Sequence, residues 1–120
     1  MPKPAPKTSL FIRIQFPGGN RFGPGKADLL EAIERTGSIS EAARSMRMSY
    51  RRAWLLVDSS NRLFRRPVVT AGPGGRSGGG ASLTPFGRDV VRRYRRMGAA
   101  IDRAAAPDLA RFKRWTVPDS

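Results

Sequence analysis

The sequence predicts a single domain of the α+β class. Its length of 120 residues suits one domain, and a composition with 39% hydrophobic and 27% charged residues is typical of a globular protein. Four stretches place apolar residues at helical spacing, while short stretches of strand type lie before the first and between the third and the fourth. Helices and strands in this arrangement fold into an α+β domain around one hydrophobic core.

The amino-terminal part predicts an extended arm, a strand and a helix. Residues 1–7 are rich in proline and lysine and are expected to form an extended, mobile arm. Residues 8–16 alternate apolar and polar side chains, which is the pattern of a half-buried strand. A turn at residues 17–20 is followed by a helix that begins near Pro24 and ends at Gly37.

Two short helices are predicted next. Ser38 and Glu41 form a capping box at the start of the first helix, in which each side chain bonds the backbone N–H of the other residue. Ser49 caps the second helix, which spans residues 50–63. We expect four apolar side chains of this helix to pack into the core: Ala53, Trp54, Val57 and Leu63.

A glycine-rich hairpin and a long helix complete the prediction. Two short strands, residues 68–71 and 81–84, flank a stretch with six glycines in nine residues. A helix then spans residues 85–106, and we expect Pro107 to end it because proline disrupts a helix interior. The predicted organisation is an arm (residues 1–7), a domain (residues 8–106) and a carboxyl-terminal tail (residues 107–120).

The chain is strongly basic, and its positive charges are clustered. It contains 23 Lys and Arg residues against 9 Asp and Glu residues, which gives a formal net charge of +14 at pH 7. Residues 43–66 contain seven arginines and one acidic residue, and residues 85–106 contain six arginines and two acidic residues. Arginine forms forked hydrogen bonds with phosphate and guanine, and clustered cations attract polyanions. The composition therefore predicts a nucleic-acid partner.

The sequence also excludes several classes of site. It has no cysteine and no histidine, which excludes disulfides, thiolate or imidazole metal sites and a Ser-His-Asp triad. We expect no enzyme activity, no metal and no cofactor. The glycine stretch lacks the Gly-Lys-Ser/Thr of a nucleotide-phosphate loop. Asp28, Glu31 and Glu34 are expected to form a solvated helix face rather than a cation site. With neither a membrane-spanning stretch nor a secretion signal, the protein is expected to be cytoplasmic, without a membrane partner.

The two short helices and the hairpin together predict a winged helix-turn-helix that binds double-stranded DNA. Ala42 and Ala43 are small enough for the two helices to cross closely. The second helix would enter the major groove with its amino-terminal part, and the hairpin would contact the backbone or the minor groove as a wing. The residues that we predict to contact DNA are Ser38, Ser49, Tyr50, Arg51, Arg52, Leu55, Arg62, Arg76 and Ser77.

A basic RNA-binding protein is the alternative, because the same arginines can contact the phosphates and the shape of folded RNA. Sequence-specific RNA-binding proteins stack unpaired bases on aromatic side chains. Aromatic residues make up only 8% of this chain, which favours duplex DNA over RNA as the partner.

The long helix predicts a homodimer. Its apolar residues are spaced nearly as in a coiled-coil seam, and its second half extends beyond what a small domain can cover. The residues predicted to form the dimer contact are Val90, Tyr94, Met97 and Ile101. Two copies would place two recognition helices about 34 Å apart, which is one turn of DNA.

Four motifs of this sequence are distinctive. They are Ser38–Ala43 (SISEAA), Met48–Trp54 (MSYRRAW), Asn61–Leu63 (NRL) and Gly74–Gly87 (GGRSGGGASLTPFG). Together they resemble the DNA-binding domain of the molybdate-responsive ModE regulators, over residues 8–106, and more distantly the winged helix-turn-helix of LysR-type regulators. The resemblance implies a two-fold dimer that controls transcription, usually as a repressor, of genes for molybdate uptake or molybdoenzymes.

The chain departs from the ModE pattern at its carboxyl end. Those regulators continue into a molybdate-binding domain, whereas this sequence ends at residue 120 and offers no evident oxyanion pocket. We therefore expect a stand-alone DNA-binding protein with no cofactor of its own. An effector such as molybdate would then act through a separate effector-binding protein.

Overall fold

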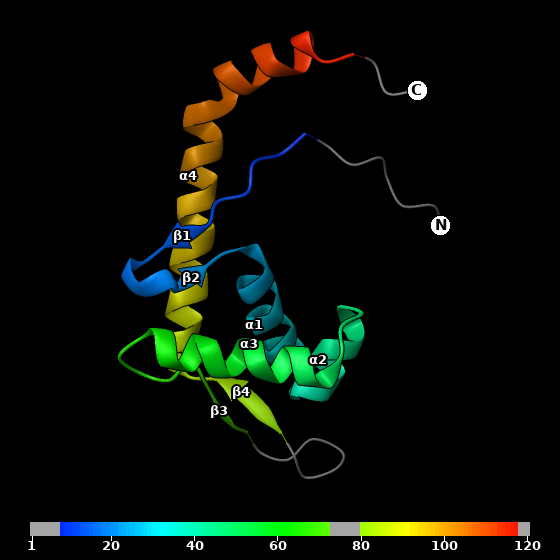
Figure 1. Cartoon of the computed structure of the whole chain (residues 1–120), viewed down its shortest axis with the longest axis vertical. Coiled ribbons are helices and arrows are strands. Elements are labelled where there is room, and N and C mark those ends of the chain that lie inside the picture. The colour runs from blue at the N-terminus through cyan, green and yellow to red at the C-terminus, as the bar shows by residue number, and fades with distance from the viewer. Residues whose placement is uncertain (1–7, 73–79, 118–120) are drawn as a thin grey trace.

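Three helices, α1 (Pro24–Thr36), α2 (Ile39–Ser45) and α3 (Tyr50–Leu63), pack together in the lower half of the molecule as Figure 1 shows it. The computed structural model describes residues 8–72 and 80–117 of the chain. All three helices lie where the sequence predicts them. Together with two small antiparallel hairpins they confirm the predicted α+β class.

Local hydrogen bonds explain where these helices begin and end. Gly37 ends α1 in the left-handed conformation, with a φ of 78°, and its N–H bonds back to the last turn at 2.8 Å. The Ser38 hydroxyl accepts a hydrogen bond from the Glu41 N–H at 2.9 Å, and the Ser49 hydroxyl accepts one from the Arg52 N–H at 3.1 Å. Both predicted serine caps are therefore present.

The capping box at the start of α2 is only half formed. The Ser38 N–H donates to the Thr36 hydroxyl oxygen at 3.4 Å, where the sequence predicts a bond to the Glu41 side chain. The Thr36 hydroxyl is fixed in this position because it donates to the Ala32 carbonyl at 2.8 Å. The Glu41 carboxylate is thus not needed as a backbone cap.

The fourth helix, α4 (Pro85–Trp115), is longer than the sequence predicts. The Thr84 hydroxyl caps it by accepting a hydrogen bond from the Gly87 N–H at 2.8 Å. The expected end at Pro107 is wrong, because the helix continues through this residue to Trp115. A proline leaves the carbonyl four residues earlier without its helical partner, and here that stretch is exposed, so solvent can satisfy the carbonyl. Figure 1 shows the orange and red end of α4 turned away from the axis of its yellow part.

The amino-terminal strand is much shorter than predicted. Within residues 8–16, strand β1 (Ile14–Gln15) pairs with β2 (Arg21–Phe22) in an antiparallel hairpin. The preceding residues extend along α4, where the Tyr94 hydroxyl donates a hydrogen bond to the Ile12 carbonyl at 2.6 Å. The alternating pattern therefore comes mainly from an extended segment that packs on a helix.

The predicted wing is present as a second hairpin. Strand β3 (Val69–Ala71) pairs antiparallel with β4 (Ala81–Leu83), close to the predicted bounds. Residues 73–79 at the tip lie outside the described residues. The predicted DNA contacts Arg76 and Ser77 belong to this part of the chain.

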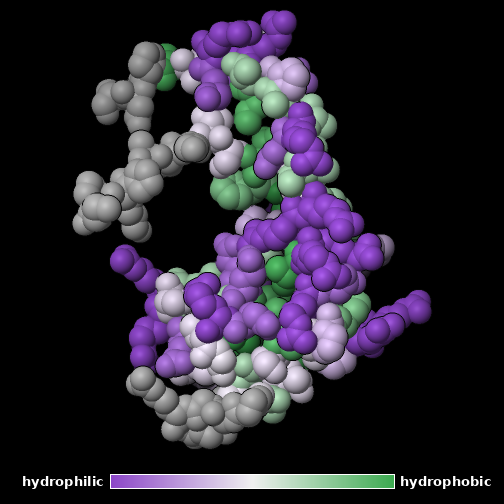
Figure 2. Space-filling model, turned by 180° about the vertical axis from the view of Figure 1, so that it is seen from behind, coloured by the Kyte–Doolittle hydropathy of each residue, from purple (hydrophilic) through white to green (hydrophobic). Residues whose placement is uncertain are grey.

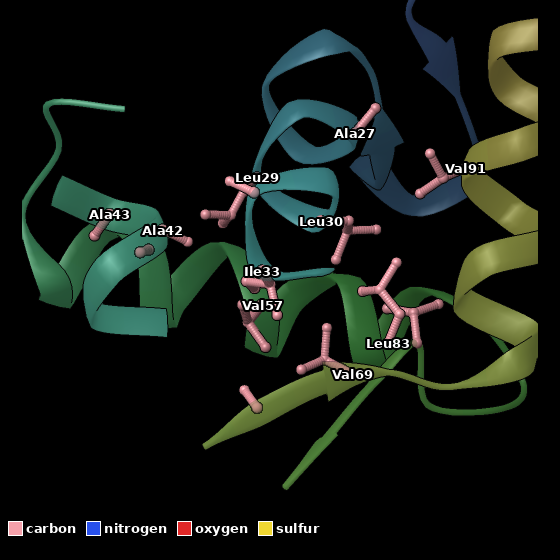
Figure 3. Close-up of a cluster of buried hydrophobic side chains, with 14 of the residues drawn as sticks. Ala27, Leu29, Leu30, Ile33, Ala42, Ala43, Val57, Val69, Leu83 and Val91 are labelled. Carbon is pink, nitrogen blue, oxygen red and sulfur yellow. The ribbon is translucent and has the colours of Figure 1, made fainter. Parts of the chain in front are cut away.

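The core surrounds α1 (Figure 3). Leu30 and Ile33 of α1 point toward Val57 of α3 and toward Val69 and Leu83 of the wing. The buried alanines of the three helices are Ala27, Ala32, Ala42, Ala43 and Ala53. Small side chains allow the helices to approach closely, and this packing fixes α3 on a rigid platform.

Tyr94 lies in the core of its own chain, so the prediction that it forms a dimer contact is wrong. Its side chain is only 5% exposed, and its ring packs edge-on against Phe22 with the centroids 5.2 Å apart. The segment around Ile12 and the β1–β2 hairpin cover it. The hydrogen bond between Tyr94 and Ile12 joins residues 82 positions apart, so no local sequence pattern could indicate that Tyr94 is covered.

Candidate nucleic-acid interface

The outward face of α3 presents most of the predicted DNA contacts. Ala53 and Val57 bury the opposite face of the helix in the core. The predicted contacts on α3 are all exposed: Tyr50, Arg51, Arg52, Leu55 and Arg62. The helix is therefore fixed on one side and accessible on the other, as a recognition helix must be.

The two predicted serine contacts also cap helices. The hydroxyl oxygens of Ser38 and Ser49 accept backbone hydrogen bonds, but each hydroxyl still has its own proton to donate. Ser49 is exposed at the amino-terminal end of α3, where the helix dipole attracts an anion, whereas Ser38 is half-buried. Ser49 is thus the better placed of the two for a phosphate.

The basic residues around α2 and α3 are mostly without acidic partners among the described residues. These exposed arginines are Arg44, Arg47, Arg51 and Arg52, which we call the α2–α3 arginines. Arg62 differs because its guanidinium lies 3.0 Å from the Asp58 carboxylate. Such an exposed pair contributes little to stability, so Arg62 can exchange its carboxylate for a phosphate.

Two arginines of α4, Arg88 and Arg95, are by contrast bound to acids of α1. Arg95 donates hydrogen bonds to Asp28, at 2.6 Å, and to Glu31, while Arg88 lies 3.4 Å from Glu34. Partial burial lowers the pKa of Arg95, but the hydrogen bonds to the two carboxylates outweigh this and raise it above its ordinary value. The three acids that we expected to form a solvated face thus join α1 to α4.

A second set of ion pairs lies within α4 itself. Arg92 and Arg93 both contact Asp89, with Arg93 Nε 3.2 Å from a carboxylate oxygen. The hydrogen bond from Arg93 is the main reason that the pKa of Asp89 lies below its ordinary value. Much of the positive charge predicted for α4 is therefore neutralised within the molecule.

The wing is attached to α3 and to the turn after α1 by hydrogen bonds. The Asn61 side-chain oxygen accepts from the N–H groups of Val68 and Val69 at 2.8 and 3.0 Å, and its amide group donates to the Val69 carbonyl at 3.2 Å. The Ala81 N–H donates to the Gly37 carbonyl at 2.9 Å. Sequence reasoning noted Asn61 in a motif but did not assign it this positioning role.

A groove of about 790 Å³ lies between α2, α3 and the wing. The groove is lined by Ser38, which caps α2, and by Glu41 of α2. Tyr50 and Asn61 line it from α3, and Thr70 lines it from β3. The predicted contacts Ser38 and Tyr50 are thus brought to one surface together with the base of the wing.

Trp54 is the main error in the predicted core. Its side chain is 47% exposed, although the sequence predicts that it anchors α3. The neighbouring Ala53 and the next-turn Val57 fill the contact with the core, and Trp54 lies beside that contact. The hydrophobicity of Trp54 alone could not predict its exposure, because Trp54 lies at the boundary between the buried face and the exposed face of α3.

The described part of the chain has neither a metal-binding cluster nor a membrane-spanning helix. Among residues 8–72 and 80–117, no group of three acidic, cysteine or histidine side chains is arranged to bind a metal ion. No helix in these residues is both long enough and apolar enough to cross a bilayer.

The chain is similar in sequence to curated proteins linked to molybdenum and to transcription. No family model matches the chain. It is 47% identical over 96 residues to the molybdenum-pterin-binding protein MopB of Rhodobacter capsulatus, covering 80% of this chain and 34% of MopB. It is 37% identical over 71 residues to the DNA-binding transcriptional dual regulator ModE of Escherichia coli, covering 59% of this chain and 27% of ModE. The chain thus spans about a third of these relatives.

The fold has a counterpart among solved structures. The full-length LysR-type regulator LysG of Corynebacterium glutamicum superposes with a TM-score of 0.53 at 22% identity. The match covers 74% of this chain and 29% of LysG. It confirms the winged-helix fold.

Proposed function

Because this chain is a homologue of the ModE and Mop proteins along part of their length, we propose that it is a double-stranded DNA-binding domain that regulates transcription. In this proposal α3 lies in the major groove, and the wing lies on the backbone or in the minor groove. The names of the relatives further support a link between the regulated genes and molybdenum.

The observation that supports the proposal most strongly is the accessible, unneutralised arginine surface of α3. Arg51 and Arg52 stand in its first turn, where recognition helices contact base edges. Each guanidinium can donate two hydrogen bonds to the O6 and N7 atoms of guanine, a contact that contributes about 1–3 kcal/mol of discrimination. Arg44 and Arg47, which precede this turn in the chain, are exposed and can contact phosphates.

The wing supports the same orientation. Asn61 and Gly37 attach it to the α2–α3 pair, so the hairpin and the recognition helix would approach a duplex together. Arg76 and Ser77, at its tip, are proposed to contact the backbone or the minor groove, where glycine permits close approach.

We also propose that two copies associate through α4. Met97 and Ile101 are exposed, whereas Val90, on the same helix face, is half-buried against the core of its own chain. Figure 2 shows apolar side chains at the surface of the upper half of the molecule, over the second half of α4. Tyr94 is not part of this proposal because its own chain covers it.

A gel-shift comparison tests the DNA-binding proposal. The full chain is titrated with random-sequence duplex DNA and with structured RNA of equal length at several salt concentrations. We expect tighter binding to the duplex and a steep loss of affinity as salt rises, because phosphate contacts release counterions. Preference for the RNA at every salt concentration would contradict the proposal and favour the RNA-binding alternative.

Sedimentation tests the dimer separately. The wild-type chain is expected to sediment as a dimer at micromolar concentration, and Ile101→Glu is expected to convert it to a monomer, because the charge would be buried in the interface. Ala100→Glu, on an exposed position of the same turn, is the matched control. A monomeric wild-type chain would refute association through α4.

A further inference from the structure

Trp54 is an exposed aromatic residue within the proposed recognition helix. Its side chain is 47% exposed although it lies in the middle of α3. Tyr50, one turn earlier on the same side of the helix, and Leu55, next to Trp54, are exposed to a similar degree. We call these three side chains the α3 apolar patch. One of them, Tyr50, lines the groove between α2, α3 and the wing.

The surroundings of the patch favour a polyanion over a second copy of the chain. Arg51 and Arg52 lie between Tyr50 and Trp54 in the sequence, and both are exposed without an ion pair to the described acids. Two copies that met through this face would bring these like charges together, which is unfavourable. The other large exposed apolar residues lie apart from it, on α4, in residues 10–11 and at Val117.

The chemistry of the major groove then identifies what the patch would contact. Base edges present hydrogen-bond donors and acceptors there, and the one apolar group among them is the C5 methyl group of thymine. Arginines account for the polar recognition of such a surface, whereas the large apolar ring of an exposed indole finds its best contact in that methyl group. We infer that Trp54, together with Tyr50, recognises thymine methyl groups in the half of the site next to the wing. This inference rests on the proposed function.

Replacement of thymine by deoxyuridine tests the inference, because the two bases differ only in the methyl group. A duplex selected by the full wild-type chain from a random pool is remade with each thymine replaced in turn. We expect one or two positions at which the replacement weakens wild-type binding about threefold to tenfold, as expected for one buried methyl group.

The Trp54→Ala variant should bind the thymine duplex more weakly and should no longer distinguish thymine from deoxyuridine at those positions. Trp54→Phe, which keeps an aromatic ring, should retain part of the discrimination. Trp115→Ala is the matched control, because Trp115 is also exposed, at 69%, but lies at the far end of α4. Its ratio of thymine to deoxyuridine affinity should equal the wild-type ratio.

Fluorescence provides a readout that does not depend on a destabilising substitution. The chain has two tryptophans, so Trp115→Phe leaves Trp54 as the single emitter, and Trp54→Phe leaves Trp115. Binding of the selected duplex should protect Trp54 from acrylamide quenching and should leave Trp115 unprotected. Equal quenching of Trp54 in the free and bound protein would overturn the inference.

The binding outcomes separate the inference from the proposed function. If the wild-type chain binds no duplex, or binds RNA more tightly, the proposed function fails and the inference fails with it. If the wild-type chain binds duplex DNA without sequence preference, or if Trp54→Ala keeps the wild-type sensitivity to the methyl group, only the inference is overturned.

Discussion

The α2–α3 arginines and the arginines of α4 form two basic regions that look alike in the sequence but differ in the structure. Arg51 and Arg52 are exposed and have no ion pair with the described acids, whereas Arg88, Arg92 and Arg95 are each bound to a carboxylate. The first group leaves its charge available to a partner. The second uses much of its charge within the molecule, so the density of arginines along a chain does not by itself locate a binding surface.

The difference also separates two physical roles. Arginines that pair across α1 and α4 fix the long helix to the helical core, which positions any dimer contact on α4. The exposed arginines of α3 that have no ion pair leave a positive surface that attracts a polyanion. On this account α4 supports the geometry, and α3 with the wing provides the binding surface.

The largest expected effect is on DNA affinity, which should depend on the α2–α3 arginines and not on the ion-paired arginines of α4. Arg51→Ala and Arg52→Ala should each weaken binding to a selected duplex by about 1–3 kcal/mol and relax its sequence preference, because each removes a forked contact to a base. Titration of selected and scrambled duplexes measures both quantities. Arg93→Ala, which removes the same charge from an ion-paired position, is the matched control and should leave the preference unchanged. An equal effect of Arg93→Ala would remove the distinction between the two regions.

The second expected effect is on stability. Arg95→Ala should lower the free energy of unfolding by about 1 kcal/mol, because it removes the hydrogen bonds to Asp28 and Glu31, and solvent screening limits their strength at this partly exposed position. Urea denaturation measures the change. Arg96→Ala, at the next position, has no ion pair with the described residues and should unfold like the wild type. A stability loss for Arg96→Ala as large as for Arg95→Ala would show that the ion pairs are not its cause.

A third, smaller effect concerns salt. Arg44→Ala should weaken binding to all duplexes alike and lower the slope of log affinity against log salt by about one, because it removes one phosphate contact. Arg92→Ala should leave the slope unchanged, since Arg92 is paired with Asp89. Affinities at four or more salt concentrations give both slopes. The same loss of slope in both variants would contradict the assignment.

The smallest expected effect is on the pH dependence of stability. The hydrogen bond from Arg93 lowers the pKa of Asp89 in the folded protein relative to its unfolded value of about 3.9. The folded state therefore gains stability from the carboxylate above that pH and loses it as the pH falls through the lower, folded pKa. Asp89→Asn should remove this part of the acid dependence in thermal melts between about pH 2 and pH 6. Identical acid dependence in both proteins would show that the ion pair is not formed in solution.

The sequence was sufficient to predict the helices because their ends are determined locally. Gly37, Ser38, Ser49 and Thr84 each form a hydrogen bond within a few residues, and such signals can be recognised in a single sequence. Pro107 shows the limit of the same reasoning. Its local effect is to disrupt a helix, but an exposed helix tolerates it with a bend.

The candidate site was predictable in part. The exposed positions of α3 follow from helical periodicity, which is why Arg51, Arg52 and Leu55 were assigned correctly to its surface. The exposure of Trp54 and the burial of Tyr94 depend on segments that pack from elsewhere in the chain. The pairing of Arg95 with Asp28 and Glu31 joins residues more than 60 positions apart, and no local pattern indicates it.

The most direct test of the account is an NMR titration of the full chain with a selected duplex. Backbone amide signals of α3 from Tyr50 to Leu55 and of strands β3 and β4 should shift, because these elements are proposed to contact the DNA. Signals from the second half of α4 should remain unchanged by the duplex. Shifts that follow the arginines of α4 and leave α3 unaffected would contradict the account.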